Sequence, residues 1–193
     1  MTRKPTILAF AGSARRGSYN RMLLGNAVEY AEHAGADVTL ADLNDFPLPI
    51  YNADLETAQG IPEPAVRFKR LMTEHDGFLI ATPEYNSMFT PLIKNLIDWS
   101  SRRLDGEPPY HGFEGKVAAI LAASPGALGG LRSAFHLRAL LSHMRVLVIP
   151  DQKTVPRADN AFDADGRLID ERTRQAVQNV AVALVQTIIK LKT

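Results

Sequence analysis

Residues 6–20 read TILAFAGSARRGSYN, an apolar run that gives way to a polar segment containing two glycines. The run at 6–11 is hydrophobic at successive positions rather than at alternating ones. This pattern predicts a β-strand that is buried on both faces of a parallel sheet. Helices cover both faces of such a sheet, so strands and helices should alternate along the rest of the chain.

The rest of the sequence follows this alternation. Apolar runs recur at 77–82, 116–123 and 145–149, and a weaker run at 37–43 suits an edge strand. Segments with helical spacing lie between them, at about 20–33, 64–75, 91–101 and 130–144, and Gly35 stands where a left-handed cap should end the first helix. An irregular stretch, 150–168, precedes the clearest helical stripe: Val177, Val180, Ala181, Leu184, Val185, Ile188 and Ile189. We therefore predict a single doubly wound α/β domain spanning residues 1–193.

Composition excludes several classes of function. The 22 basic and 21 acidic residues give a formal net charge of +1, which offers no electrostatic reason to bind nucleic acid or an anionic membrane. The chain has no cysteine, which excludes disulfides, thiolate nucleophiles and cysteine-bound metal centres. Residues 1–4 lead into a strand rather than into the core of a signal peptide, and the apolar run 117–123 is too short to cross a bilayer. We expect a soluble cytoplasmic protein.

Ligands of open parallel sheets bind outside the carboxyl ends of the strands, near the point where strand order reverses. The loop after the first strand carries glycines at 12 and 17, which let the backbone bend close to a ligand, and it leads into a helix whose first N–H groups are free. These features predict a pocket for one phosphate dianion. The candidate binding residues of this loop are Ser13, Arg15, Ser18, Tyr19 and Asn20.

Two other phosphate motifs do not fit this loop. A Walker loop requires a lysine where the chain has Ser18, and the dinucleotide fingerprint G-x-G-x-x-G is absent because Ser13 and Ala14 follow Gly12. A terminal monophosphate therefore suits the loop better than a pyrophosphate. The alternative is purely structural, with Ser18 or Asn20 capping the helix and the arginines solvated.

Two further loops could hold a flat ring. The loop after the 77–82 strand offers an aromatic face from Tyr85 and polar groups for a ring edge, with candidates Pro83, Glu84, Tyr85, Asn86 and Ser87. The loop after the 116–123 strand is rich in glycine, so its backbone could approach a ligand, and amides of the next helix could stabilise negative charge. Its candidates are Ser124, Gly126, Gly129 and Gly130. The alternatives are a tight turn with an exposed tyrosine and a flexible glycine-rich loop.

The three loops together resemble the NADPH-dependent FMN reductase family, the flavodoxin-like quinone, azo-dye and chromate reductases. The motif G-S-x-R-x-x-S-x-N is met at residues 12–20, and T-P-E-Y-N stands at 82–86 before a helix with Lys94, Asn95, Asp98 and Trp99. A serine-containing glycine loop occupies 124–130, and residues 42–51 are similar to the family's linker after the second strand. The resemblance covers nearly the whole chain.

The resemblance implies strand order 2-1-3-4-5, bound FMN and a ping-pong reaction. NADPH or NADH would deliver a hydride to flavin N5, and a quinone or a similar acceptor (azo, nitro or chromate) would then be reduced in the same pocket. The chemistry would be that of FMN, with no catalytic side chain. The resemblance also implies a homodimer or homotetramer, with the 91–101 helix at the interface. Two alternatives stay open: a reductase that releases reduced FMN to a partner monooxygenase, and a non-enzymatic electron carrier like flavodoxin.

Some residues carry no predicted site. The five histidines have no spacing that demands a metal, and His136 and His143 suit helix packing or surface exposure. Residues 163–166 begin like a calcium loop but lack the required glutamate, because the twelfth position is Arg174, so a turn is expected. Arg102 and Arg103 are surface charges, or one of them reaches a neighbouring subunit or the phosphate of a nicotinamide cofactor.

Overall fold

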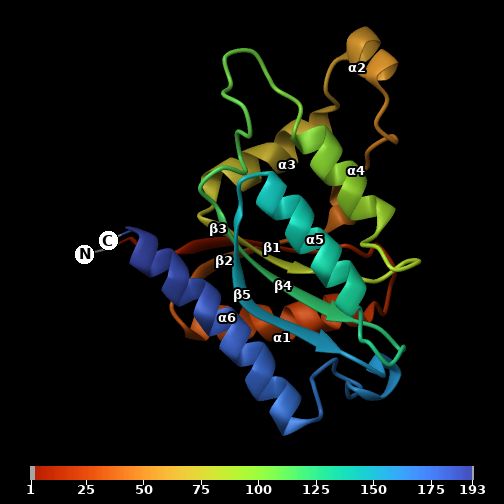
Figure 1. Ribbon diagram of the computed structural model, residues 1–193, viewed down its shortest axis with the longest axis vertical. Coiled ribbons are helices and arrows are strands. Elements are labelled where there is room, and N and C mark those ends of the chain that lie inside the picture. Colours follow the sequence, from red (N-terminus) through yellow and green to blue (C-terminus); the bar gives the residue numbers. More distant parts are fainter. Residues whose placement is uncertain (1–2, 193) are drawn as a thin grey trace.

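The computed structural model describes residues 3–192, which build one five-stranded sheet in the order β2-β1-β3-β4-β5 (Figure 1). All four strand pairings are parallel. The order is that of a flavodoxin-like doubly wound sheet, so the predicted fold class is confirmed. The strands are β1 (Thr6–Ala11), β2 (Asp37–Ala41), β3 (Gly77–Ala81), β4 (Val117–Ala123) and β5 (Leu147–Val155).

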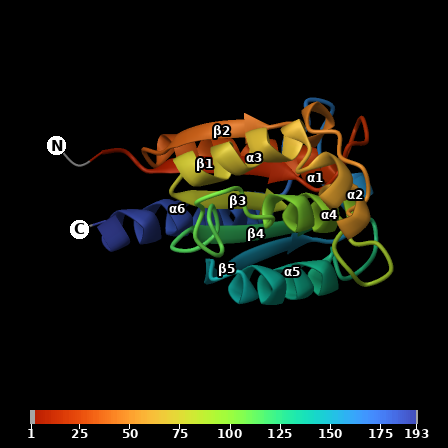
Figure 2. The ribbon, with the colours of Figure 1, turned by 90° about the horizontal axis from the view of Figure 1, so that it is seen from above.

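Six α-helices surround the sheet in the described part of the chain. Seen from above, α3, α4 and α5 lie on one side of the strands, while α1 and α6 lie on the other (Figure 2). Four of these helices are predicted from the sequence to within two residues, and the predicted apolar stripe 177–189 lies within the last one. Gly35 adopts the expected positive φ of 97° after α1. The helices are α1 (Tyr19–His33), α2 (Ala53–Gln59), α3 (Glu63–Glu74), α4 (Pro91–Ser100), α5 (Leu131–His143) and α6 (Glu171–Lys192).

The helix α2 is absent from the prediction. None of its seven residues is buried, so its sequence carries no apolar stripe that could reveal it. Its first turn is capped by Asn52, whose side chain accepts a hydrogen bond from the Asp54 amide at 2.8 Å. In the residues described, no helix is long and apolar enough to cross a membrane.

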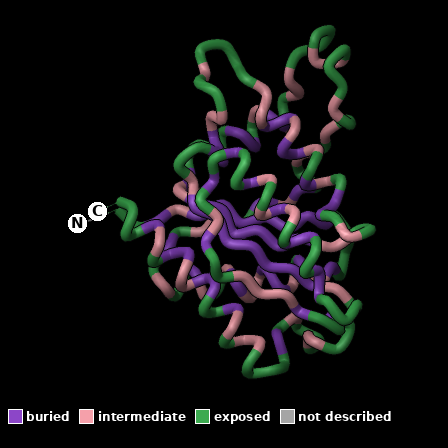
Figure 3. The backbone as a smooth tube through the Cα atoms, in the orientation of Figure 1, coloured by how far each residue is buried: buried purple, intermediate pink, exposed green. Residues whose placement is uncertain are grey.

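The sheet separates two hydrophobic layers, and the central strands are the most deeply buried part of the molecule (Figure 3). Every residue of β3 and β4 is buried, as continuous hydrophobicity predicts for strands covered on both faces. One layer lies against α1 and α6 and includes Leu23 and Leu184. The other lies against α3, α4 and α5 and includes Phe68, Ile93 and Leu137.

The last strand differs from its prediction. Residues 145–149 were expected to form a strand buried on both faces, but β5 begins at Leu147, continues to Val155 and forms an edge of the sheet with several exposed residues. Its register against β4 shifts, since Val148 pairs with Ala118 while Gln152 pairs with Ile120. The bulge between them accommodates Pro150, which an edge strand tolerates.

The bulge in β5 is held by Arg138 of α5. Its guanidinium donates hydrogen bonds to the carbonyl oxygens of Val148 (3.2 Å) and Ile149 (2.7 Å) and to the side chain of Gln152 (2.9 Å). These bonds join α5 to β5 on both sides of Pro150. The Arg138 side chain of α5 therefore supplies hydrogen bonds to β5 where Pro150 interrupts the strand.

Candidate cofactor-binding site

The three predicted loops converge at the carboxyl ends of β1, β3 and β4, which lie side by side in the sheet. There they enclose an open cavity of about 140 Å³. Ala123 and Pro125 also line it, and these two residues are not among those predicted from the sequence. Nine predicted residues line this cavity: Ser13, Arg15, Ser18, Tyr19, Asn20, Pro83, Glu84, Tyr85 and Ser124.

The first loop ends at the N-terminus of α1. Ser18 is the N-cap, and its hydroxyl oxygen accepts a hydrogen bond from the Arg21 amide at 3.4 Å. Within residues 3–192, the amides of Tyr19 and Asn20 have no hydrogen-bond acceptor, as expected for the first turn of a helix. The capping role of Ser18 and a binding role are compatible, because these two amides stay free for an anion.

The polar side chains of this loop differ in their surroundings. Ser13 is only 7% exposed, and the bond that it makes within the described chain is a weak one, in which its hydroxyl accepts from the Arg15 amide at 3.4 Å. The Arg15 side chain is exposed, and its guanidinium carbon lies 5.5 Å from the centroid of the Tyr19 ring. A buried hydroxyl and a cation thus lie on the same short loop.

The two glycines of the first loop have different roles. Gly17 has a φ of +64° and open space around it, so it provides the left-handed turn before α1. Gly12 was expected to bring the backbone close to a ligand. Instead, a Cβ atom at Gly12 would lie 2.3 Å from Cδ1 of Ile93, so this glycine allows α4 to pack against the end of β1. The hydroxyl of Thr90 donates to the Gly12 carbonyl at 2.8 Å in the same contact.

Asn20 joins the first loop to the third. Its side-chain nitrogen donates to the carbonyl oxygen of Ala123 at 2.8 Å, and its side-chain oxygen accepts from the amide of Ala123 at 2.9 Å. Both polar atoms of the side chain are therefore engaged at the end of β4. Asn20 holds two loops of the cavity together, and direct binding by this residue, predicted from the sequence, would use its backbone amide.

The second loop is a tight hairpin. Tyr85 and Met88 exchange two backbone hydrogen bonds of 2.9 and 3.0 Å, and Asn86 (φ 50°) and Ser87 (φ 69°) form the turn between them. Positive φ at two successive residues that are not glycine is a costly conformation that persists where the surroundings enforce it. The turn presents the Tyr85 side chain, 55% exposed, at the cavity. Asn86 and Ser87 themselves do not line it.

Glu84 braces this hairpin against α5. Its carboxylate accepts hydrogen bonds from the amides of Arg132 (3.1 Å) and Ser133 (3.4 Å) and forms an ion pair with the Arg132 side chain. A carboxylate at a helix N-terminus is favourable because it meets the positive end of the helix dipole. Glu84 therefore occupies these two amides, which leaves neither of them free for the predicted stabilisation of a reduced ring.

The glycines of the third loop serve packing as well. A Cβ atom at Gly129 would lie 2.6 Å from the backbone nitrogen of Pro156, and one at Gly130 would lie 2.8 Å from Cβ of Ala122. Both glycines also have positive φ, 60° and 88°. Gly129 and Gly130 are thus required because neighbouring parts of the same chain pack closely against them. Neither these two glycines nor Gly126 lines the cavity, so their predicted contact with a cofactor stays a prediction.

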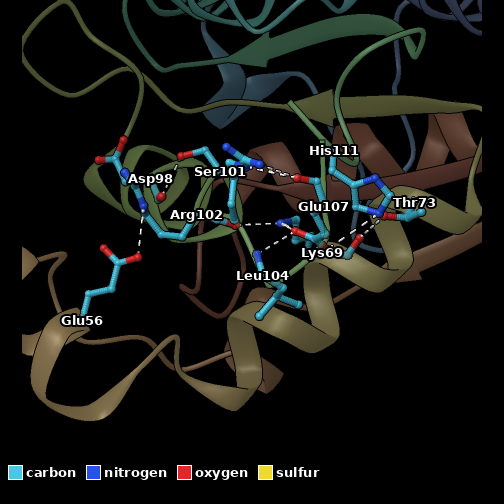
Figure 4. Close-up of polar contacts among 10 residues, drawn as sticks. Glu56, Lys69, Thr73, Asp98, Ser101, Arg102, Leu104, Glu107 and His111 are labelled. Atoms are coloured by element: carbon cyan, nitrogen blue, oxygen red, sulfur yellow. Dashed lines mark hydrogen bonds and ion pairs between the residues drawn. The ribbon is translucent and has the colours of Figure 1, made fainter. Parts of the chain in front are cut away.

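Arg102 and Arg103 make contacts within the chain. Nε of Arg102 lies 3.3 Å from a carboxylate oxygen of Glu56 in α2 (Figure 4). Its guanidinium carbon lies 5.4 Å from the Tyr51 ring centroid. Arg103 donates two hydrogen bonds, of 3.1 and 2.8 Å, to the carbonyl oxygen of Glu107. Both arginines thereby stabilise the loop that follows α4, and neither of them lines the cavity.

The same loop covers a buried lysine. Lys69 of α3, 4% exposed, donates to the carbonyl oxygen of Arg102 at 2.6 Å and pairs with the Glu107 carboxylate (Figure 4). Burial acts to raise the pKa of Glu107, but the hydrogen bonds from Lys69 and from the Leu104 amide outweigh it, so this pKa is below its ordinary value. The Glu107 carboxylate is therefore charged at neutral pH.

The two histidines of α5 lie as predicted. His136 is half-buried, with its ring 5.5 Å from that of Phe135, and His143 is exposed at the end of the helix. Within residues 3–192, no three side chains of His, Asp and Glu gather as metal ligands would.

Comparisons with known proteins agree with this fold. Residues 5–160 match the family model described as NADPH-dependent FMN reductase. The chain is 40% identical to an NAD(P)H-dependent FMN reductase of Pseudomonas aeruginosa, over 92% of each chain. It is 37% identical to an NAD(P)H:quinone oxidoreductase of Solanum tuberosum, over 96% of this chain and 94% of that one.

A solved structure leads to the same family. The flavoenzyme FerB of Paracoccus denitrificans, an NAD(P)H:(acceptor) oxidoreductase, superposes with a TM-score of 0.81 at 32% identity, covering 96% of this chain and 98% of that chain. The sequence-based prediction of an oxidoreductase of this kind is confirmed. The chain belongs to the NADPH-dependent FMN reductase family.

Proposed function

We propose that the chain binds FMN in the cavity between the three loops and uses it to reduce quinones or similar acceptors with NADPH or NADH. The observation that carries this proposal is the convergence of an anion site and an aromatic face on one cavity. The free amides of Tyr19 and Asn20, the buried Ser13 hydroxyl and the Arg15 cation supply the anion site. Tyr85 supplies the aromatic face.

These residues fit a flavin mononucleotide. The first loop offers donors but no carboxylate, which suits a phosphate dianion. Among residues 3–192, Glu84 is the only carboxylate that lines the cavity, and it is bound by Arg132 and the α5 amides, so its charge is neutralised locally. The ring of the cofactor would meet the exposed face of Tyr85, whose hairpin is fixed by the Glu84 brace.

Bound FMN would supply the redox chemistry by accepting a hydride from NAD(P)H and passing two electrons to an acceptor. The chain would contribute binding and orientation. Arg15 and the α1 amides would neutralise the phosphate, the Ser18 cap would fix the start of α1, and Tyr85 would cover one face of the ring. The cavity is open to solvent, so flat acceptors of several kinds, including quinones, azo and nitro compounds, can approach, and chromate is small enough to enter as well.

Titration of the purified protein with FMN, followed by gel filtration, tests the proposal. We expect saturable binding and a yellow protein after filtration. A protein that takes up no FMN contradicts the proposal. Binding that is lost on the column would instead favour release of reduced FMN to a partner enzyme, which the open cavity and the exposed Tyr85 permit.

A homodimer or homotetramer, predicted from the family resemblance, is part of this proposal. Large apolar side chains are exposed on the elements that border the cavity: Tyr85 (55%), Met88 (43%), Leu128 (48%), Leu131 (43%) and Phe135 (64%). Exposed apolar groups of this size often mark contact surfaces. Light scattering during gel filtration measures the mass, and a monomer at micromolar concentration would contradict this part. The cytoplasmic location stays a prediction.

A further inference from the structure

The connection between β5 and α6 contacts the first loop, although it does not line the cavity. The Phe162 ring stacks on the Tyr19 ring, with centroids 6.2 Å apart and an interplanar angle of 7°. Tyr19 is the first residue of α1, and its ring also lies under the Arg15 guanidinium. The Tyr19 ring therefore links Phe162, in the connection before α6, to the Arg15 cation of the first loop.

A rigid turn fixes the position of Phe162. The side chain of Asp163 accepts hydrogen bonds from the amides of Asp165 (3.0 Å) and Arg167 (2.8 Å), so the predicted turn is confirmed. Phe162 and Leu168 flank the turn as an antiparallel pair, and Leu168 is 1% exposed in the core. Phe162 is half-buried beside it and packs against the same core.

The turn is attached to α1 at Asn26, which lies seven residues after Tyr19 in the same helix. The side chain of Asn26 donates to the carbonyl oxygen of Gly166 at 2.8 Å and accepts from the amide of Leu168 at 3.2 Å. Gly166 has a φ of +77°, and a Cβ atom there would lie 3.3 Å from Cγ of Met22. Asn26, Met22 and Tyr19 belong to one helix. The contacts of the turn with α1 therefore set its position relative to the first loop.

We propose that Phe162 is a positioning residue for the phosphate of the cofactor: by stacking on Tyr19, it holds the ring on which Arg15 rests at the mouth of the cavity. An exposed arginine has many rotamers, and restricting them before binding lowers the entropy lost on binding. The ligand group concerned is a phosphate monoester. The effect therefore applies to FMN and not to riboflavin, which lacks the phosphate. This inference rests on the proposed function.

Flavin fluorescence titrations of the intact protein test this inference. We expect Phe162→Ala to weaken FMN binding about two- to tenfold, the range for a lost aromatic pair. Riboflavin affinity should not change, and Phe162→Tyr should retain FMN affinity because it keeps the flat ring. The matched control is Ile169→Ala, an exposed apolar residue of the same connection, which should change neither affinity.

Phe162→Leu serves if the alanine variant folds poorly, since it keeps apolar volume without the flat ring and should show the same selective loss. A second arm places Phe162→Ala in an Arg15→Ala background. There we expect the loss to disappear, because the group being positioned is gone. Equal losses for FMN and riboflavin, or a full loss in that background, overturn the inference while leaving FMN binding intact. A wild-type protein that binds no FMN overturns the proposed function itself.

Discussion

Arg15 is the one cationic side chain of the first loop that lines the cavity, while its neighbour Arg16 does not. If the cavity holds the phosphate of FMN, Arg15→Ala removes a charge-assisted hydrogen bond and should weaken FMN by about 1.5–3 kcal/mol. Riboflavin should lose much less. Calorimetric or fluorescence titration with both flavins measures this difference. The control is Arg16→Ala, and equal losses from both variants would place the phosphate elsewhere.

Gly12 and Gly25 offer a matched pair for the packing role of glycine. A Cβ atom at position 12 would meet Ile93 at 2.3 Å, whereas one at position 25, within α1, would meet nothing within 4 Å. Gly12→Ala should therefore lower the free energy of unfolding by about 1–3 kcal/mol through overpacking. Gly25→Ala should raise it by about 0.5–1 kcal/mol. Urea denaturation without cofactor measures both, and a neutral Gly12→Ala would refute the close contact.

The individual residues also show what the sequence could not reveal. The candidate residues follow from their types and order, but their partners do not. Asn20 bonds to Ala123, which is 103 positions away, and Gly12 packs against a helix 81 positions away. Such roles depend on long-range packing, which no local pattern encodes. The Phe162 contact with Tyr19 is of the same kind.

At the scale of elements, the brace between the second loop and α5 should be measurable. Glu84→Ala removes the carboxylate that caps α5 and should destabilise the fold by about 1.5–3 kcal/mol, the range for hydrogen bonds to a charged group. Glu84→Gln keeps one acceptor and should lose less. Glu29→Ala, at an exposed position of α1, is the control and should stay within about 0.5 kcal/mol. Thermal unfolding that ranks Glu84→Ala with the control would contradict the brace.

The loop after α4 should make stability depend on acid pH. The pKa of Glu107 is lower in the folded state than its ordinary value of 4.5, so the carboxylate stabilises the fold above that value. This contribution is lost as the pH falls below about 4.5 towards the lowered pKa. Glu107→Gln should reduce the free energy of unfolding at neutral pH by about 1.5–3 kcal/mol.

The same variant should also lose less stability on acidification than the wild type does. The other carboxylates with lowered pKa values, Asp42, Asp76 and Asp170, are present in both proteins, so the difference between the two curves reports Glu107. Denaturation at a series of pH values provides both curves. Parallel curves of unfolding free energy against pH would show that the protonation of Glu107 does not contribute to the loss of stability in acid.

Elements with a strong apolar pattern are predictable, and those that lack one are not. The strands β1, β3 and β4 carry continuous hydrophobicity and appear at their predicted places. The helix α2 has no buried face and was missed. The sequence predicts that the last strand ends at residue 149, before Pro150, whereas β5 continues to Val155 through the bulge held by Arg138.

At the scale of the whole molecule, topology explains why the three loops meet. β1, β3 and β4 are neighbours although long segments separate them in sequence, and their carboxyl ends lie at the right-hand edge of the sheet in Figure 1. The strand order reverses beside β1, which is where ligands of such sheets bind. The fold therefore places the site, and the loops determine its ligand.

In the function proposed for this chain, bound FMN takes electrons from NAD(P)H and gives them to a quinone. Anaerobic mixing of the FMN-loaded protein with NADPH or NADH, with the flavin absorbance recorded before and after a benzoquinone is added, tests it most directly. We predict rapid loss of the oxidised-flavin absorbance with at least one nucleotide and its return on addition of the quinone. A flavin that stays oxidised with both nucleotides, or a protein that cannot be loaded with FMN, would contradict the proposed function.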